Sequence, residues 1–242
     1  SQNFVDLVPG SYTVTETLPV VGFRLADITC SDLTGGATGT LVTTSVPDGA
    51  LKVELAPGAD YACTFTNVAN ANVAVIKNTV GGDETFTYTT TGSGNAVDPA
   101  PSITTAGGTG SAAFDVVFDA IVLTREITIT EDALPAGWIL TAISCTDGLG
   151  QAIGTPDLAT NSVTFSVSAG EAVSCRFTNE KLPTVTAIRK VSIGGTDTFE
   201  FIDGTNGLPA TLSLDTGVAN PVDSTSYTLD ALNTATSITE II

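Results

Sequence analysis

Apolar and polar residues alternate in short runs along most of this sequence. Ile127–Glu131 reads ITITE, Phe86–Gly92 reads FTYTTTG and Val163–Gly170 reads VTFSVSAG. Alternation with a period of two, in runs rich in β-branched and aromatic residues, predicts strands with one buried and one exposed face. Stretches that contain Gly and Pro separate these runs and predict turns. We therefore expect an all-β protein with almost no helix.

The run ITITE ends in an acidic residue on the face that should be buried. Alternation places Ile127, Ile129 and Glu131 on the same side of the predicted strand. The pattern recurs in YTVTE, which ends at Glu16, and in SITE, which ends at Glu240. An acidic residue that recurs in this position three times is a feature that the fold or the function requires.

Three pairs of matching segments show that the chain is built from a repeat. Its period is about 113 residues, the separation of Lys77 and Lys190, and in both copies of the first match a glutamate precedes a cysteine by 14 positions. The matching segments are residues 16–32 with 131–147, 53–67 with 165–179, and 74–88 with 187–201.

These matches divide the chain into three parts. Residues 70–181 form a complete central repeat, predicted to be a β-sandwich of seven or eight strands. Residues 1–69 form the C-terminal part of a first repeat, and residues 182–242 the N-terminal part of a last repeat. Because a half-sandwich exposes its core face, we expect flanking repeats of a longer chain, or neighbouring copies of this chain, to complete both. The glutamate is present in both partial repeats, which favours the longer chain.

Four cysteines form two matched pairs, one in each of the first two repeats. The repeat predicts disulfides between Cys30 and Cys63 and between Cys145 and Cys175. Each would close a loop of roughly 30 residues and stabilise its repeat by about 3–4 kcal/mol. Disulfides persist in oxidising compartments, so we expect an extracellular protein. The long spacings and the absence of His disfavour a zinc site.

Alternation also places a lysine and an asparagine of the central repeat inward. Lys77 shares a face with Val75, and Asn179 shares a face with Phe177. Burial favours the neutral forms of lysine and glutamate, and a neutral lysine amine is a nucleophile. If Glu131 carries protons between the two groups, the predicted product is an amide that joins Lys77 to Asn179. The other repeats hold parts of this set: Glu16 and Asn67 in the first, and Lys190 and Glu240 in the last.

Two other arrangements of these side chains are open. Lys77 could form a buried ion pair with Glu131, with Asn179 as a hydrogen-bonding cap, or its side chain could extend to the edge of the sandwich. The recurrence of Lys77 at Lys190, in a chain with only four lysines, favours the amide.

The strand-borne lysine, the TE and LP turn in the middle, and the terminal FTN resemble the SpaA-like and Cna B-type domains of the prealbumin-like fold. Such domains occur as tandem repeats in bacterial cell-surface proteins, and the resemblance covers nearly the whole chain. In many of them an isopeptide bond joins the lysine to the asparagine under catalysis by the glutamate. The resemblance thus implies Lys77, Glu131 and Asn179 as an autocatalytic triad. A cysteine four residues before each asparagine departs from the usual pattern, since a disulfide would already fix that strand.

The composition excludes several kinds of partner. The formal net charge is −18, with only 8 Lys and Arg residues, so the chain has no basic surface for nucleic acid and would be repelled by anionic membranes. No apolar run approaches the ~20 residues needed to span a bilayer. Glycine-rich stretches such as 105–111 precede strands, which favours hairpin turns over phosphate-binding loops. We expect no cofactor and no metal; calcium at the Asp-rich turns is the alternative, although no known ligand spacing is present.

The sequence therefore predicts a structural protein of a bacterial cell-surface stalk or extracellular filament, stabilised by disulfides and by Lys–Asn isopeptide bonds. Cross-links between the first and last strands would resist unravelling and proteolysis. The alternative is an adhesin module that binds a glycan or host protein, although only 6% of the residues are aromatic. We do not expect an enzyme, because amide formation within the chain is a single turnover and no His is available for a Ser-His-Asp triad.

Overall fold

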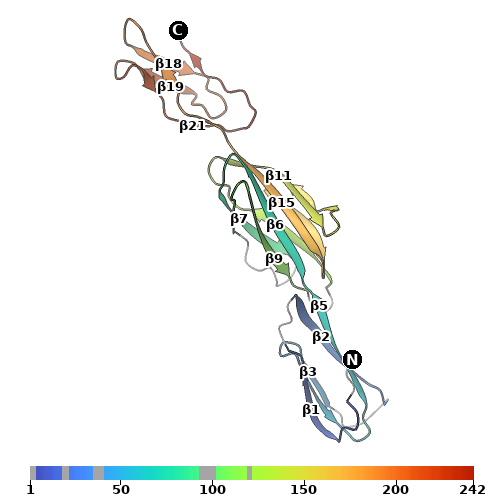
Figure 1. The fold of residues 1–242 in the computed structure, drawn as a ribbon. Helices are drawn as coiled ribbons and strands as arrows, with labels where there is room; N and C mark the ends of the chain where they lie inside the picture. Colours follow the sequence, from blue (N-terminus) through green and yellow to red (C-terminus); the bar gives the residue numbers. More distant parts are fainter. Residues whose placement is uncertain (1–3, 18–21, 35–40, 93–101, 119–121) are drawn as a thin grey trace.

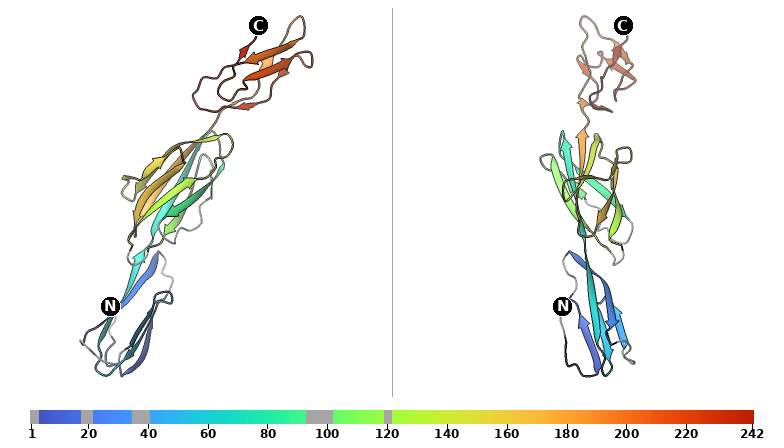
Figure 2. Two further views of the ribbon diagram at one scale, coloured as in Figure 1. Left: turned by 180° about the vertical axis from the view of Figure 1, so that it is seen from behind. Right: turned by 90° about the vertical axis from the view of Figure 1, so that its right-hand side faces the viewer.

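The computed structural model describes residues 4–17, 22–34, 41–92, 102–118 and 122–242. It is all-β, and these residues contain no helix, so none of them lies in a helix long and apolar enough to cross a membrane. Figures 1 and 2 show three β regions that follow one another end to end, and the central one is the largest. The proline turn of the first repeat, residues 18–21, lies outside the described residues.

The central repeat is a sandwich of two five-stranded sheets. One sheet has the strand order β13-β14-β10-β7-β8, and the other has the order β12-β11-β15-β6-β9. Its strands are β6 (Ala71–Val80), β7 (Thr85–Gly92), β8 (Ser102–Thr104), β9 (Thr109–Val116), β10 (Thr124–Glu131), β11 (Trp138–Asp147), β12 (Ala152–Ile153), β13 (Thr155–Asp157), β14 (Ser162–Ser168) and β15 (Ala172–Lys181).

The first and last long strands of the central repeat lie side by side. β6 and β15 pair in parallel over nine residue pairs, from Ala172 opposite Asn72 to Glu180 opposite Val80. β6 pairs with β9 on its other edge, and β15 pairs with β11. Chain segments about 100 residues apart in sequence are therefore held in one sheet.

The core of the central repeat follows the predicted alternation. On β6 the residues Ala71, Val73, Val75 and Lys77 are buried, and the residues between them are more exposed. Trp138 is buried and packs edge-on against Phe86. Because the inward positions of both sheets are mostly apolar, the sandwich closes over a continuous core.

The first repeat holds a three-stranded sheet, β1-β4-β3, and a two-stranded sheet, β2-β5. Only Asn70 separates the last strand of this repeat from β6, and Val68 belongs to the core of the central repeat. The strands are β1 (Gly10–Thr15), β2 (Phe23–Asp32), β3 (Leu41–Ser45), β4 (Ala50–Leu55) and β5 (Tyr61–Ala69). The order of both sheets matches that of β10-β14-β13 and β11-β15 in the central repeat.

The last repeat matches the other half of the sandwich. Its sheets β19-β18-β22 and β17-β20 correspond to β8-β7-β10 and β6-β9, and a further pair, β16-β21, follows the central repeat. The strands are β16 (Thr184–Val185), β17 (Arg189–Lys190), β18 (Thr198–Ile202), β19 (Thr211–Asp215), β20 (Val222–Asp223), β21 (Tyr227–Thr228) and β22 (Thr239–Glu240).

The glycine-rich stretches are turns, but the strands on their two sides do not pair with each other as the predicted hairpins would. At residues 105–111 an isolated antiparallel bridge between Ala106 and Thr109 closes the turn. The turn after β6 and the turn after β8 each carry the chain from one sheet to the other, because β6 and β9 share one sheet while β7 and β8 share the other. Gly81 in the first of these turns has φ +93°, and a Cβ atom there would lie 3.0 Å from Cβ of Lys181. The prediction failed because the alternation of apolar and polar residues within a strand does not show which sheet the next strand joins.

Candidate intramolecular cross-linking site

Three strands carry Lys77, Glu131 and Asn179 into the interior of the central sandwich. Lys77 lies on β6, Glu131 is the last residue of β10, and Asn179 lies near the end of β15. Their exposed fractions are 0%, 2% and 0%. The alternation of each strand predicted this inward direction, and the burial of all three residues agrees with it.

The Lys77 ammonium contacts a carboxylate and an aromatic face. Its Nζ atom donates a hydrogen bond to Oε1 of Glu131 and lies 4.0 Å from the centre of the Phe86 ring. Burial lowers the pKa of Lys77 to about 8, although the hydrogen bond and the charge of Glu131 oppose the shift. A usable fraction of the amine is therefore neutral, and nucleophilic, near neutral pH.

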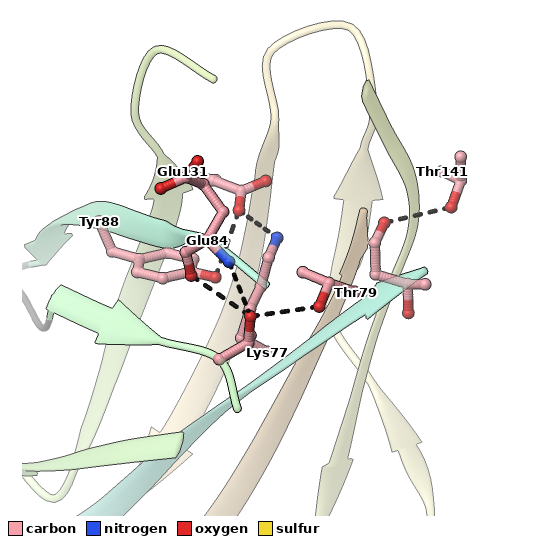
Figure 3. Close-up of polar contacts among 8 residues, drawn as sticks. Lys77, Thr79, Glu84, Tyr88, Glu131 and Thr141 are labelled. Atoms are coloured by element: carbon pink, nitrogen blue, oxygen red, sulfur yellow. Dashed lines mark hydrogen bonds and ion pairs between the residues drawn. The ribbon is translucent and has the colours of Figure 1, made fainter. Parts of the chain in front are cut away.

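A second donor binds the same carboxylate oxygen. Tyr88 lies directly opposite Glu131 in the β7–β10 ladder, and its hydroxyl donates to Oε1 of Glu131 at 3.3 Å. Figure 3 shows the side chains of Lys77 and Tyr88 converging on this oxygen. Oε2 of Glu131 is buried and has no hydrogen-bond partner among the described residues.

The Asn179 side chain is buried without a hydrogen-bond partner among the described residues. Both Nδ2 and Oδ1 lack one, and they are enclosed at the same end of the sandwich. In the parallel ladder Phe177 is opposite Lys77, so Asn179 lies one diagonal step farther along. Strand spacing and rise place such Cα atoms about 8 Å apart, which a lysine side chain spans. An unsatisfied buried amide is costly, and an amide bond to Lys77 would remove one of its two N–H donors together with the buried ammonium.

A β-bulge lies next to the asparagine. The β11–β15 register shifts between Leu140 and Ala142, just after Leu140 pairs with Asn179, and the hydroxyl of Thr141 donates to the Thr178 carbonyl at 3.2 Å. The bulge lets both Trp138 and Ile143 face the core although they are an odd number of residues apart.

The first repeat has the same bulge at the same place. There Leu25 pairs with Asn67, and the β2–β5 register shifts between Leu25 and Asp27. The bulge is therefore part of the repeat, and it lies beside the asparagine both times.

Comparison with known families agrees with this architecture. The model of a SpaA-type family, described as a prealbumin-like fold domain, matches residues 1–69 and 73–181, which is more than half of the chain. The chain belongs to this prealbumin-like fold family. No curated protein has a sequence that matches the chain.

The prealbumin-like domains of this chain carry the two predicted disulfides. Cys30 bonds to Cys63 across β2 and β5, and Cys145 bonds to Cys175 across β11 and β15. The second disulfide is buried, whereas both cysteines of the first are only partly buried. Each disulfide joins the asparagine-bearing strand to its neighbour in the same sheet, so neither duplicates a link from β15 to β6.

The first and last repeats contain parts of the same contact set. In the first repeat, Nδ2 of Asn67 donates to Oε1 of Glu16 at 2.7 Å. In the last repeat, the Lys190 ammonium donates to Oε1 of Glu240 and lies 3.9 Å from the centre of the Phe199 ring. These contacts pair residues about 50 positions apart, and all are more exposed than those of the central repeat.

Sequence reasoning missed the aromatic residues that line the site. Phe86 and Tyr88 face inward from β7, and inward aromatic residues are so common in sandwich cores that alternation alone gives them no special role. The repeat could have revealed the role of Phe86, because Phe199 takes its place beside the second lysine, Lys190. The repeat could not have revealed a role for the Tyr88 hydroxyl, because the residue at the equivalent position is Phe201.

A buried hydroxyl network near the site was also missed. Thr105 accepts a hydrogen bond from the Glu84 backbone N–H at 3.0 Å and one from the Thr79 hydroxyl at 3.2 Å. In the last repeat Thr216 accepts from the Asp197 backbone N–H and from the Ser192 hydroxyl in the same way. This network fixes the turn that follows the lysine strand in both repeats.

The carboxylates of the Asp-rich turns accept hydrogen bonds from backbone N–H groups. Asp147 accepts the N–H groups of Leu149 and Gln151, and Asp83 accepts those of Gly107 and Gly108. These bonds hold the pKa of the Asp83 carboxyl below its usual value. No group of three or more metal-ligating side chains is found in the part of the chain that the structure describes.

Proposed function

We propose that this chain is a load-bearing structural segment of a bacterial cell-surface stalk or filament, with a central repeat locked by an amide bond between Lys77 and Asn179. One observation carries the proposal: a fully buried lysine contacts a buried glutamate while an asparagine amide with no hydrogen-bond partner among the described residues lies on the adjacent parallel strand. The family and the two disulfides support a structural role.

The chemistry needs no partner beyond the three side chains. The neutral Nζ atom of Lys77 attacks Cγ of Asn179, and Glu131 moves a proton from Nζ to the departing amide nitrogen. The new N–C bond replaces the C–Nδ2 bond of Asn179, and one ammonia leaves. Glu131 ends the reaction in the protonation state in which it began. The reaction is a single turnover within one chain, so it does not make the protein an enzyme.

The position of this bond would suit a segment under tension. β6 is entered from the first repeat and β15 leads to the last repeat, and the two strands are parallel. Pulling on the two ends therefore shears β6 against β15. With Lys77 bonded to Asn179, the load would pass from residues 71–77 directly to residues 179–181, and the rest of the sandwich would carry none of it.

Other features support the extracellular setting. The disulfides require an oxidising compartment, and a net charge of −18 keeps neighbouring stalks apart. Exposed apolar residues in the outer repeats, such as Phe4 at 62%, Ile193 at 97% and Val218 at 84%, favour cover by further repeats of a longer chain or by a neighbouring copy.

Single-molecule force spectroscopy tests the load-bearing role. The chain is pulled by its two ends in reducing solution, so that the disulfides contribute nothing. We expect no extension step from the central repeat, whereas Asn179→Ala should release a step of roughly 35 nm as residues 78–178 unfold. Asn72→Ala, a matched change on exposed β6 surface, should behave as the unchanged chain. An equal step in the unchanged chain and in Asn179→Ala would refute the proposal.

A further inference from the structure

Tyr88 is fully buried, and its hydroxyl group donates a hydrogen bond to Glu131. Its exposed fraction is 1%, and its ring packs edge-on against Phe177 with the ring centres 5.2 Å apart. Phe177 is the residue directly opposite Lys77 in the parallel ladder. Tyr88 therefore reaches across the sandwich from β7 to β15 and touches both sides of the candidate reaction site.

The two oxygens of Glu131 have different surroundings. Oε1 accepts hydrogen bonds from both the Lys77 ammonium and the Tyr88 hydroxyl, whereas Oε2 has no hydrogen-bond partner among the described residues. A carboxyl oxygen that accepts two donors has used its two lone pairs. Because the Lys77 contact is made to Oε1, a proton that Lys77 gives up reaches Glu131 at the oxygen that the Tyr88 hydroxyl holds in place.

Tyr88 stays a proton donor while this happens. Burial, followed by the charge of Glu131 and the hydrogen bond to it, raises the pKa of Tyr88 well above its usual value. The titratable groups that face Tyr88 from the neighbouring strands are Lys77 on β6 and Glu131 on β10. The hydroxyl keeps its hydrogen over the whole range in which the lysine changes charge.

We propose that Tyr88 is a positioning residue for amide formation: its hydroxyl donates to Oε1 of Glu131 and holds that oxygen against Lys77, so that the carboxyl group takes the lysine proton and passes it to the departing amide nitrogen. This inference rests on the proposed function, since it concerns the same reaction. The last repeat shows that this pairing of strands does not need the hydroxyl. Phe201 stands opposite Glu240 there, in the same cross-strand position that Tyr88 takes opposite Glu131.

The test measures the rate of amide formation after folding. The full chain, recovered unfolded in urea, is refolded under oxidising conditions, and burial of Trp138 is followed by fluorescence. Loss of one ammonia from the peptide pair containing Lys77 and Asn179 is followed separately by mass spectrometry. Tyr88→Phe removes only the hydroxyl. Tyr12→Phe is the matched control, because it removes a hydroxyl that donates to the Val8 carbonyl, outside the site.

We expect Tyr88→Phe to fold at the normal rate and then lose ammonia roughly ten- to hundredfold more slowly, the effect of losing one hydrogen bond to a charged group. Tyr12→Phe should react as the unchanged chain. A purely structural role would alter folding and not the later step. An unchanged rate in Tyr88→Phe would overturn the inference and leave the proposed function intact. If the unchanged chain never loses ammonia, the proposed function itself fails.

A second measurement covers the case in which Tyr88→Phe does not fold. In the unlinked Asn179→Ala chain, the hydroxyl proton of Tyr88 should be visible by NMR and protected from exchange with solvent. Glu131→Ala in the same background should abolish that protection, because the acceptor is removed. A hydroxyl proton that exchanges equally fast in both chains would overturn the inference.

Discussion

The central and last repeats make the same contact between a lysine and a glutamate, in very different surroundings. In both, the ammonium donates to the glutamate and lies over a phenylalanine ring, at 4.0 Å in the central repeat and 3.9 Å in the last. The side chains of Lys77 and Glu131 are 0% and 1% exposed, whereas those of Lys190 and Glu240 are 18% and 32% exposed.

This difference shows which strands form the lysine–glutamate contact and which strands bury it. The lysine strand, its aromatic neighbour and the glutamate strand suffice to form the pair, since the last repeat has all three. The deep burial in the central repeat comes from strands β11, β14 and β15, which complete the two sheets. Burial makes the lysine a usable nucleophile, and β15 brings the asparagine. The pair is thus a property of half of the repeat, and the reactivity that we propose for it depends on the whole sandwich.

The largest expected effect comes from removing the proton carrier. Glu131→Gln should abolish the cross-link between Lys77 and Asn179, because an amide side chain cannot accept the lysine proton and pass it on. Glu240→Gln makes the same change in the last repeat and should leave the cross-link intact. Peptide mass spectrometry of the two variants checks this prediction. A normal yield of cross-link in Glu131→Gln would remove Glu131 from the reaction.

The aromatic residue beneath each lysine should matter in proportion to its burial. In the unlinked Asn179→Ala chain, Phe86→Ala should lower the free energy of unfolding of the central repeat by about 3–5 kcal/mol, because it leaves a cavity beside a buried charge. Phe199 is only partly buried, so Phe199→Ala should cost less than about 2 kcal/mol in the last repeat. Urea denaturation measures both. Equal losses would contradict the assigned difference in burial.

The stability of the unlinked central repeat should rise with pH. Lys77 has a pKa of about 8 in the folded state and about 10.5 when unfolded, so between these values the unfolded chain binds more protons. In Asn179→Ala, the penalty of the buried charge is fully present below pH 8. It is relieved as the pH rises to about 10.5, by a few kcal/mol at most.

The control for this pH dependence is Lys77→Met in the same Asn179→Ala background. Since the methionine carries no titrating group, the rise in stability between pH 8 and 10.5 should disappear. Urea denaturation at a series of pH values compares the two chains. An equal rise in both would show that other groups cause it.

The smallest expected difference concerns the disulfides. Cys30–Cys63 and Cys145–Cys175 close loops of similar length, with sequence separations of 33 and 30, so their effects on the unfolded chain are nearly equal. The second is buried and the first only partly, so a thiol reductant should open Cys30–Cys63 several times faster in the folded protein. Timed alkylation and peptide mapping measure this. In urea the two rates should converge.

Much of the fold and part of the site could be predicted from the repeat and from alternation. Alternation placed Lys77, Glu131 and Asn179 inward, because a side chain on a regular strand has only two directions. The repeat gave the pairing of the cysteines. These are local properties, and each depends on residues close together in sequence or on the comparison of equivalent positions.

The remaining features depend on contacts between distant strands. The parallel pairing of β6 with β15 joins segments about 100 residues apart, and no local pattern encodes it. The bulge at Thr141 could have been predicted, since Trp138 and Ile143 are both apolar but cannot share a face on a regular strand. The hydrogen bond from Tyr88 to Glu131 could not have been predicted from the repeat, because Phe201, the counterpart of Tyr88, lacks the hydroxyl.

The covalent state of Lys77 and Asn179 in the purified chain tests the proposed cross-link most directly. The intact protein and its proteolytic peptides are weighed before and after reduction of the disulfides. We expect a branched peptide pair that contains both residues, is lighter by one ammonia than its two parts, and survives reduction. If Lys77 and Asn179 appear only on separate linear peptides of full mass, the central repeat is held by its disulfide and a buried ion pair, and the proposed cross-link does not exist.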